Sequence, residues 1–510
     1  MLKKTIIFIF LFTPIFAQID KLSQEITTES IKAHVLILAS DSLEGREVGT
    51  IGEEMAADYI STFYNEIGIQ PYKDSTYYQE FDLGSRQFED VEIKINTNTY
   101  MFGKDFYSYP KFTNTNIFSS NLIFLGYGIE SENYNDYNVD VTGKIIIVID
   151  GEPQEKNGTY IVSGTNKESP QAHYKQKIKL AKIKGAQAIL FIKKNIPLNY
   201  EKYKHYIEDP GVFLLEKESM IPFFYISQEM ANSLFGTKKL KKIKQKISKR
   251  GEGFHKISTE SLSIKTTNKE SFFTGKNVLG FIEGSDPMLK NEIIIITAHY
   301  DHIGIIDGLI HNGADDNASG TAAVMEIAKV FQLAKEEGVE FKRSVLCMPV
   351  SAEEKGLLGS YYYAENPEYP LVNTIANLNI DMIGRMDEFH PNNDNYIYLI
   401  GSDKLSTDLH NTSELANNKY MDIELDYTFN DPNDPNRFYY RSDHYNFAKN
   451  GIPAIFYFSG VHEDYHKHTD TVEKLNYDKI SKIARLVFFT AWELSNAKDR
   501  PVVDKINEFN

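Results

Sequence analysis

The sequence NGADDNASG, at positions 312–320, places two aspartates, Asp315 and Asp316, side by side in front of a helical pattern. Adjacent carboxylates repel each other, and a turn or a helix start needs only one residue of this kind. We therefore expect one aspartate of the pair to have a partner elsewhere in the chain, while its neighbour holds the turn.

Acidic and histidine residues also follow four apolar segments in the second half of the chain. The segments at 293–296, 344–350, 374–380 and 453–458 have the composition of buried strands. The residues that follow them are His299 and Asp301, Glu353 and Glu354, Asp381, and the three histidines His462, His466 and His468. Open α/β sheets bind ligands beyond the carboxyl ends of their strands, so we predict that these side chains meet at one sheet edge.

Such a group of carboxylates and imidazoles would be electrostatically costly without a counter-ion, and its acids would be driven towards their neutral forms. Divalent metal ions remove this cost. Three carboxylates and two imidazoles form a donor set that suits zinc. Two metal ions would need a carboxylate that bridges them, and one aspartate of the 315–316 pair can be that bridge while the other turns away.

The composition limits the class of protein. The 510 residues include 55 Lys and Arg against 71 Asp and Glu, a formal charge of −16. This balance argues against a nucleic-acid-binding protein, because phosphate contact favours a basic surface. Cys347 is the only cysteine, so no disulfide can form within the chain. It lies in the apolar run RSVLCMPV and is predicted to be a buried strand residue, which argues against a cysteine peptidase.

The N-terminal sequence MLKKTIIFIFLFTPIFAQ combines two lysines with an apolar run at 5–17. The run is too short to cross a bilayer core of about 30 Å and is typical of a signal peptide. We predict a signal peptide at 1–17 and an exported protein, periplasmic or secreted, with no stable membrane anchor.

Three further regions differ in pattern. Residues 27–70 contain two helical patterns around a glycine-rich turn, and short strands rich in Tyr, Phe and Asn extend from about 78 to 270. From about 275 onward, long apolar strands alternate with helices, which is typical of an α/β domain. The predicted division is an N-terminal part of the main domain at 18–85, an insert at 86–270 and the rest of the main domain at 271–510.

Five motifs in order carry a family resemblance: HYDH, GADDNASG, AEEKGLLGS, NIDMIGR and YHKHTDT. They resemble the co-catalytic two-zinc aminopeptidases of metallopeptidase clan MH, which include bacterial leucyl-type aminopeptidases and, more distantly, glutamate carboxypeptidase II. The resemblance implies an α/β zinc-peptidase domain with a mixed central β-sheet flanked by helices. The middle section, with DVTGKIIIVIDG and KGAQAILFI, is similar to the β-rich protease-associated domain that many relatives carry as an insert.

The resemblance also implies metal ligands. His299 and Asp381 match ligands of one zinc, Glu354 and His466 match ligands of the other, and Asp316 matches the carboxylate that bridges two Zn²⁺ ions per chain. His466 is assigned because three residues separate it from Asp470 and Thr471, as in the family pattern H-x-x-x-D-T. The chain departs from that pattern at 467–469, where relatives commonly have a proline before the aspartate, so His468 stays a rival ligand.

Three other residues match positions with a role in the reaction. Glu353 matches the general base, and Asp301 matches the acid that orients the imidazole of His299. Tyr465 is a candidate for assisting the developing oxyanion. His302, His311 and His462 are predicted to be structural, and Arg441 and Asp443 receive no role.

The resemblance implies an aminopeptidase that hydrolyses N-terminal residues from peptides. Three alternatives stay open: a carboxypeptidase or dipeptidase of the same clan, a glutaminyl cyclase, and a non-catalytic protein like the transferrin receptor. A free amino terminus compared with a blocked one separates the first of these alternatives from an aminopeptidase. The sequence predicts neither the side-chain preference nor the oligomeric state.

Overall fold

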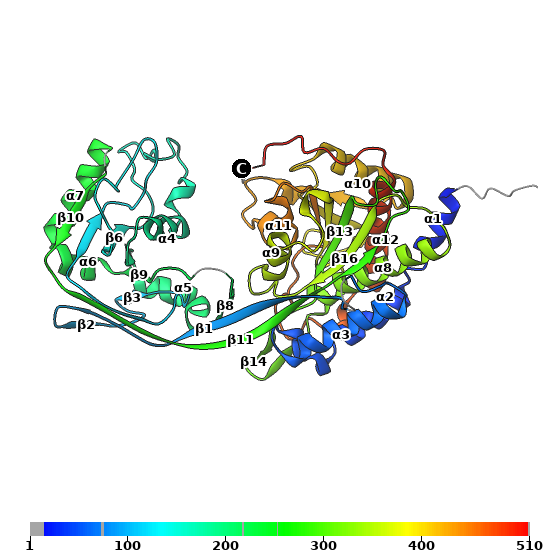
Figure 1. The fold of residues 1–510 in the computed structure, drawn as a ribbon, viewed down its shortest axis with the longest axis horizontal. Coiled ribbons are helices and arrows are strands. Elements are labelled where there is room, and N and C mark those ends of the chain that lie inside the picture. The colour runs from blue at the N-terminus through cyan, green and yellow to red at the C-terminus, as the bar shows by residue number, and fades with distance from the viewer. Residues whose placement is uncertain (1–14, 73–75, 217–218, 252, 508–510) are drawn as a thin grey trace, which may run out of the picture. The chain divides into compact units, whose positions relative to one another are not determined.

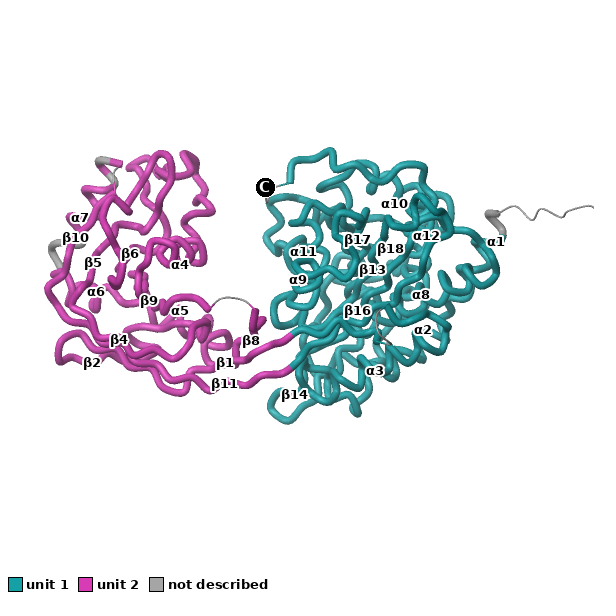
Figure 2. The backbone as a smooth tube through the Cα atoms, in the orientation of Figure 1, with its two compact units in different colours: residues 1–81, 274–510 teal, residues 82–273 magenta. Residues whose placement is uncertain are grey.

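The computed structural model describes residues 15–72, 76–216, 219–251 and 253–507. The chain divides into two compact units, residues 1–81 with 274–510 and residues 82–273 (Figure 2). The predicted signal peptide at 1–17 lies mostly outside the described residues, and the first described helix is α1 (Ile15–Ser23). None of the helices in the described ranges is both long and apolar enough to cross a bilayer.

The first unit is built on a mixed sheet of seven strands (Figure 1). In spatial order the strands are β12 (Gly280–Ile282), β16 (Ser344–Val350), β13 (Ile293–His299), β17 (Thr374–Ile380), β20 (Ala454–Phe458), β18 (Tyr396–Ile400) and β19 (Glu424–Asp426). The four strands from β16 to β20 are mutually parallel, whereas β12 and β18 run antiparallel to their neighbours β16 and β20. The prediction of a mixed sheet in an α/β domain is confirmed.

The central strands are apolar along their whole length because both faces of the sheet are covered. Side chains alternate between the faces. Ile294 and Ile296 belong to the larger core, together with Cys347, while Ile293 and Ile295 belong to a smaller core on the opposite face. Cys347 is therefore a buried strand residue, as the sequence predicts.

Helices cover these two faces. The larger core is shared with α2 (Thr28–Leu38), α3 (Ile51–Glu66), α8 (Gly320–Glu336), α10 (Thr407–Tyr420) and α12 (Tyr477–Asn496), and the smaller core with α9 (Leu358–Glu365) and α11 (His444–Ala448). The two helices predicted within 27–70 are α2 and α3. Each begins after a threonine, Thr27 or Thr50, whose hydroxyl accepts a backbone N–H of the first turn.

The second unit contains two sheets with its own core. One sheet has the order β10 (His255–Ser258), β5 (Leu122–Leu125), β6 (Ile145–Ile149), β7 (Ala188–Ile192), β9 (Phe223–Ile226) and β3 (Phe106–Tyr107). The other contains β2 (Asn98–Tyr100), β1 (Tyr78–Ile95), β11 (Leu262–Val278) and β4 (Thr115–Ser119), with β8 (Gly211–Leu214) paired to β1. Its helices are α4 (Tyr174–Ile183), α5 (Ile196–Glu208), α6 (Gln228–Phe235) and α7 (Thr237–Arg250).

The limits of this unit, 82 and 273, lie a few residues outside the predicted insert at 86–270. The difference has a simple cause. Both passages of the chain between the units occur inside the long strands β1 and β11, so no loop or change in composition marks them in the sequence. The identity of the insert as a protease-associated domain stays a prediction.

Candidate active site

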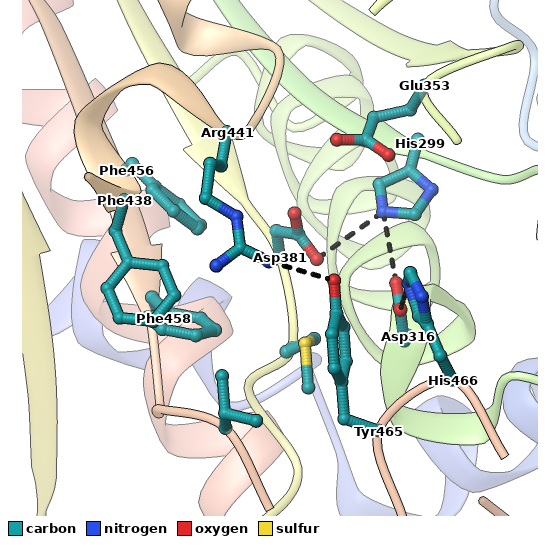
Figure 3. Close-up of a pocket in the computed structure, with 12 residues that line it drawn as sticks. His299, Asp316, Glu353, Asp381, Phe438, Arg441, Phe456, Phe458, Tyr465 and His466 are labelled. Carbon is teal, nitrogen blue, oxygen red and sulfur yellow. Dashed lines mark hydrogen bonds and ion pairs between the residues drawn. The ribbon is translucent and has the colours of Figure 1, made fainter. Parts of the chain in front are cut away.

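The predicted site residues meet at the carboxyl ends of the four parallel strands of the first unit. His299 is the last residue of β13, Asp381 follows β17, and Glu353 and Glu354 follow β16. His466 lies in the loop after β20. Figure 3 shows His299, Asp316, Asp381 and His466 turned toward one another, with Glu353 beside His299. Parallel strands end at the same edge of a sheet, and this topology brings together residues far apart in the sequence.

One group of atoms that could bind a metal ion, called here the first donor group, is centred on His299. Its Nε2 atom lies 3.3 Å from Asp316 Oδ1 and 3.4 Å from Asp381 Oδ1. The other ring nitrogen, Nδ1, donates to the backbone carbonyl of Asp301 at 3.1 Å, which directs Nε2 at the carboxylates. Asp381 is held in turn, because Ser442 Oγ donates to its Oδ2 atom at 2.7 Å.

A second donor group, formed by atoms of Asp316, Glu354 and His466, lies on the other side of Asp316. His466 Nε2 is 3.2 Å from Asp316 Oδ2 and 3.2 Å from Glu354 Oε2. The two oxygens of Asp316 thus face two different groups of imidazole and carboxylate atoms. This is the arrangement that a bridging carboxylate requires.

Asp315 points to the opposite side and holds the turn. Its Oδ1 atom accepts the backbone N–H of Gly384 at 2.6 Å, and its Oδ2 atom lies 3.3 Å from His462 Nε2. Asp470 supports the same turn by accepting the backbone N–H groups of Asp315 at 3.0 Å and Asp316 at 3.2 Å. The turn, residues Ala314–Ser319, precedes α8 and has non-helical backbone angles at Asp316, so the pair does not cap the helix directly.

The carboxylate of Asp301 contacts the loop after β16. Its two oxygens accept the backbone N–H groups of Glu353 at 3.1 Å and Glu354 at 3.3 Å, whereas His299 Nδ1 is 3.8 Å from the nearer oxygen. Asp301 therefore orients the imidazole through its backbone carbonyl and the two glutamates through its side chain. Complete burial raises the pKa of Asp301 to about 7.

Glu353 lies at the edge of the cluster. One donor atom each of His299, Glu353 and Asp381 lie within 4.8 Å of one another. Burial, together with nearby carboxylates such as Glu354, raises the pKa of Glu353 well above its ordinary value. A carboxylate with a raised pKa next to a reaction centre is suited to accepting and returning a proton.

A pocket of about 350 Å³ opens beside Glu353. Its lining combines five cluster residues, Glu353 included, with Tyr465, Arg441 and five apolar side chains, namely Met382, Phe438, Phe456, Phe458 and Val461. Arg441 Nη2 donates to the Tyr465 hydroxyl at 3.3 Å (Figure 3). Burial raises the pKa of Tyr465, so this hydroxyl stays protonated at neutral pH and can donate a hydrogen bond into the pocket.

The structure separates the two rival histidines of the C-terminal motif. His466 contacts Asp316 and Glu354, whereas the ring of His468 lies 6.0 Å from that of His311. The ring of Tyr465 stacks on His466 with centroids 3.9 Å apart. His466, and not His468, is therefore in position to bind a metal.

Three residues with a place in the site are absent from the predicted set. His302 is fully buried with Nδ1 2.9 Å from Glu354 Oε1, Ser442 holds Asp381, and Arg46 fastens the loops around the site. The motif HYDH contains His302, three positions after His299, and this spacing was the available signal. Nothing in the local sequence marks Arg46 or Ser442, because their partners are distant in the chain.

The residues present fit a divalent metal centre. Several buried acceptor atoms of the cluster lack a hydrogen-bond donor among the described residues: Asp316 Oδ2, Glu354 Oε1 and Asp381 Oδ1. Buried carboxylates without partners are unfavourable unless a cation compensates them. Burial alone would raise the pKa of Asp316, and contact with His299 and His466 outweighs it and holds the pKa well below the ordinary value. The fold and the site together define an α/β protein whose histidine and carboxylate side chains at the sheet edge fit a metal ion.

The comparison with known families gives the same assignment. Residues 277–491 match the model of peptidase family M28. Aminopeptidase YwaD of Bacillus subtilis is 26% identical over 313 residues, which cover 59% of this chain and 61% of that protein. A probable zinc metalloprotease of Pyrenophora tritici-repentis is 26% identical over 299 residues, which cover 48% of this chain and 59% of that protein. The chain thus spans about three fifths of the length of these relatives.

Solved structures show the fold. The aminopeptidase from Aneurinibacillus sp. strain AM-1 aligns with 96% of this chain and 98% of its own, with a TM-score of 0.55 and 19% sequence identity. At this identity the likeness concerns the fold alone.

Proposed function

We propose that this protein is an exported zinc aminopeptidase that hydrolyses the N-terminal peptide bond of peptides at a two-zinc centre. The position of Asp316 carries the proposal. Its two oxygens lie 3.3 Å from His299 and 3.2 Å from His466, in two separate groups of donors. The match of residues 277–491 to peptidase family M28 and the names of the relatives, an aminopeptidase and a zinc metalloprotease, support both the metal and the reaction.

In this proposal His299, Asp316 and Asp381 would hold the first zinc, and Asp316, Glu354 and His466 would hold the second. Zinc, when bound, supplies Lewis acidity that lowers the pKa of water and polarises a carbonyl. Glu353 accepts the proton of the attacking water and returns it to the leaving amine. Tyr465, which stays protonated, donates a hydrogen bond to the oxyanion that develops on the substrate.

The pocket suggests the substrate side chain. Phe438, Phe456 and Phe458 are almost completely buried and form one apolar wall next to the cluster. An apolar side chain placed there loses its contact with water, at about 25 cal/mol for each Å² of apolar surface. We therefore expect leucine or phenylalanine at the substrate N-terminus to be preferred over charged residues.

One observation favours a second candidate, a carboxypeptidase or dipeptidase. Arg441 lines the same pocket and presents its guanidinium beside the cluster. A guanidinium pairs well with a carboxylate, so Arg441 could recognise the free carboxyl end of a peptide. Substrates that differ only in which end is blocked distinguish the two functions.

The test combines metal content with such substrates. The purified chain is expected to bind two zinc ions and to release nitroaniline from leucyl-nitroanilide but not from its N-acetylated form, in a chelator-sensitive manner. Preference for N-blocked peptides with a free carboxyl end would support the second candidate. A folded chain that bound no zinc, even when zinc was added, would overturn both.

The role of Glu353 is tested by Glu353→Ala, with Glu365→Ala on the exposed surface of α9 as the control. Glu353→Ala is expected to keep its zinc and to lose roughly 10²–10⁴-fold in rate, the usual range for loss of a general base. Loss of metal, or activity near that of the control, would contradict the assignment.

Export and the nature of the insert complete the proposal. We propose that residues 1–17 direct export and are removed, and that the second unit is a protease-associated domain. The apolar run at 5–17 and the strand sequences of the insert support these two points.

A further inference from the structure

His302 occupies an unusual environment for a histidine. It follows Asp301 in the segment after β13, its side chain is fully buried, and its backbone N–H donates to the carbonyl of Arg46 at 3.2 Å. Neither ring nitrogen forms a well-directed hydrogen bond with a described residue. A buried polar group without a hydrogen bond is unfavourable, so we expect His302 to have a partner that these contacts do not include.

The ring nevertheless lies against the second donor group. His302 Nδ1 is 2.9 Å from Glu354 Oε1 and 3.8 Å from Asp316 Oδ2. The contact with Glu354 is close but poorly directed for a hydrogen bond, since both atoms remain without a partner. Two atoms that approach each other without pointing at each other are expected when both point at a common ion.

The nitrogen-to-oxygen distances in the second donor group are close to those of a tetrahedral zinc site. Zinc bonds of about 2.0–2.1 Å to nitrogen and oxygen place the ligand atoms of a tetrahedral site roughly 3.3 Å apart. His466 Nε2 lies 3.2 Å from both Asp316 Oδ2 and Glu354 Oε2. His302 Nδ1 lies 3.8 Å from the same Asp316 oxygen and 2.9 Å from the other oxygen of Glu354, Oε1. The rings of His302 and His466 approach the cluster at an angle of 73° to each other.

Gly313 provides the space for the His302 ring. A Cβ atom at position 313 would lie 2.5 Å from Cγ and 2.6 Å from Cδ2 of His302, and 2.2 Å from the backbone oxygen of Asp316. The backbone of Gly313 is also left-handed, with φ of +56°. The turn that carries Asp316 is thus shaped around this imidazole.

We propose that His302 is a third imidazole ligand of the metal centre and binds the second metal together with Asp316, Glu354 and His466. The inference rests on the metal centre of the proposed function and goes beyond its ligand set. Sites with four protein ligands are closed, whereas catalytic sites keep a position open. The open positions therefore belong to the first metal, which His299, Asp316 and Asp381 hold and beside which Glu353 lies.

Cobalt(II) substitution tests the proposal by counting imidazoles. Each histidine bound to cobalt retains one ring N–H whose proton signal is strongly shifted and disappears in D₂O. The cobalt-loaded wild-type chain is expected to show three such signals, from His299, His302 and His466, and His302→Phe is expected to remove one. The control is His444→Phe, which changes another fully buried histidine and should leave all three signals.

Metal affinity gives a second readout. Loss of a residue that only orients a ligand typically weakens metal binding 10–100-fold. Because His302 is proposed to be a ligand itself, His302→Phe should weaken the binding of one of the two cobalt ions by more than about 100-fold. Two signals in a cobalt-loaded wild type, or unchanged signals in His302→Phe with affinity within 100-fold, would overturn the proposal and leave the two-metal function intact. A folded wild type that bound no cobalt would overturn the metal centre itself and this inference with it. The wild-type count decides the matter if His302→Phe does not fold.

Discussion

Arg46 Nη2 donates to the backbone carbonyl of Gly313 at 3.0 Å, although the two residues are 267 positions apart in the chain. The same guanidinium donates to the carbonyls of Leu38, Tyr300 and Asn312. Arg46 thereby joins the N-terminal segment to the end of β13 and to the turn that carries Asp316. Burial lowers the pKa of Arg46 to about 10, so it stays charged at neutral pH beside the acidic cluster.

Replacing Arg46 by leucine should destabilise the first unit. The change removes the hydrogen bonds from Arg46 to four backbone carbonyls and removes a positive charge from a buried acidic region. We expect a loss of roughly 3–5 kcal/mol in the free energy of unfolding, the range for loss of a buried charged partner. Urea titration followed by the fluorescence of Trp492, the only tryptophan and a core residue of this unit, measures it.

Arg500→Leu is the control for Arg46. Arg500 is exposed, donates to the carbonyls of Val372 and Thr374 at 3.3 Å and lies 3.9 Å from Glu292. Because these contacts are those of an exposed side chain, its replacement should change the unfolding free energy by less than about 1 kcal/mol. A loss below about 1 kcal/mol in Arg46→Leu would show that Arg46 does not hold the loops together.

The environment of Glu326, which lies outside the candidate site, should make the free energy of unfolding depend on pH. It lies on α8, accepts from Ser30 Oγ at 2.6 Å and His34 Nε2 at 3.0 Å, and contacts Lys329. Burial alone would raise its pKa, but these partners outweigh burial and lower the pKa below the ordinary 4.5. Below 4.5 the unfolded chain therefore binds more protons than the folded one. The stabilisation is complete above that value and is lost as the pH falls through the folded-state pKa.

Glu326→Gln should therefore unfold more easily than the wild type at pH 7, by about 1–3 kcal/mol, and the gap should narrow below about pH 4.5. Urea titrations at pH 7, 5 and 4 measure the gap, and Glu337→Gln, exposed just after the same helix, should show none. A gap that stayed constant between pH 7 and pH 4 would mean that the charge of Glu326 is not its cause.

Cys347 should be unreactive in the folded protein. It lies in β16 with no exposed surface, and burial raises the pKa of its thiol. Thiolate is the reactive form, so we expect no reaction with Ellman's reagent under native conditions and one reacting thiol per chain in guanidinium chloride. Fast reaction of the native protein would contradict the packing of β16.

Local patterns in the sequence determined where the strands and most site residues lie. The runs at 344–350 and 374–380 coincide with β16 and β17, because a strand that is buried on both faces must be apolar throughout. β13 extends three residues beyond its predicted end, so His299 lies in the strand itself. The histidines and acids were found because each follows such a run directly.

Only the tertiary structure decided what contacts those residues make. In the folded chain the Asp315 carboxylate contacts Gly384 and His462. Asp301 accepts the backbone N–H groups of Glu353 and Glu354. His302 lies against the second donor group. The roles of Arg46 and Ser442 follow only from their hydrogen bonds to residues that are distant in the chain. The physical reason is that a strand or helix follows from the pattern of its neighbours in sequence, whereas the contacts of a buried polar side chain depend on which segments the fold packs around it.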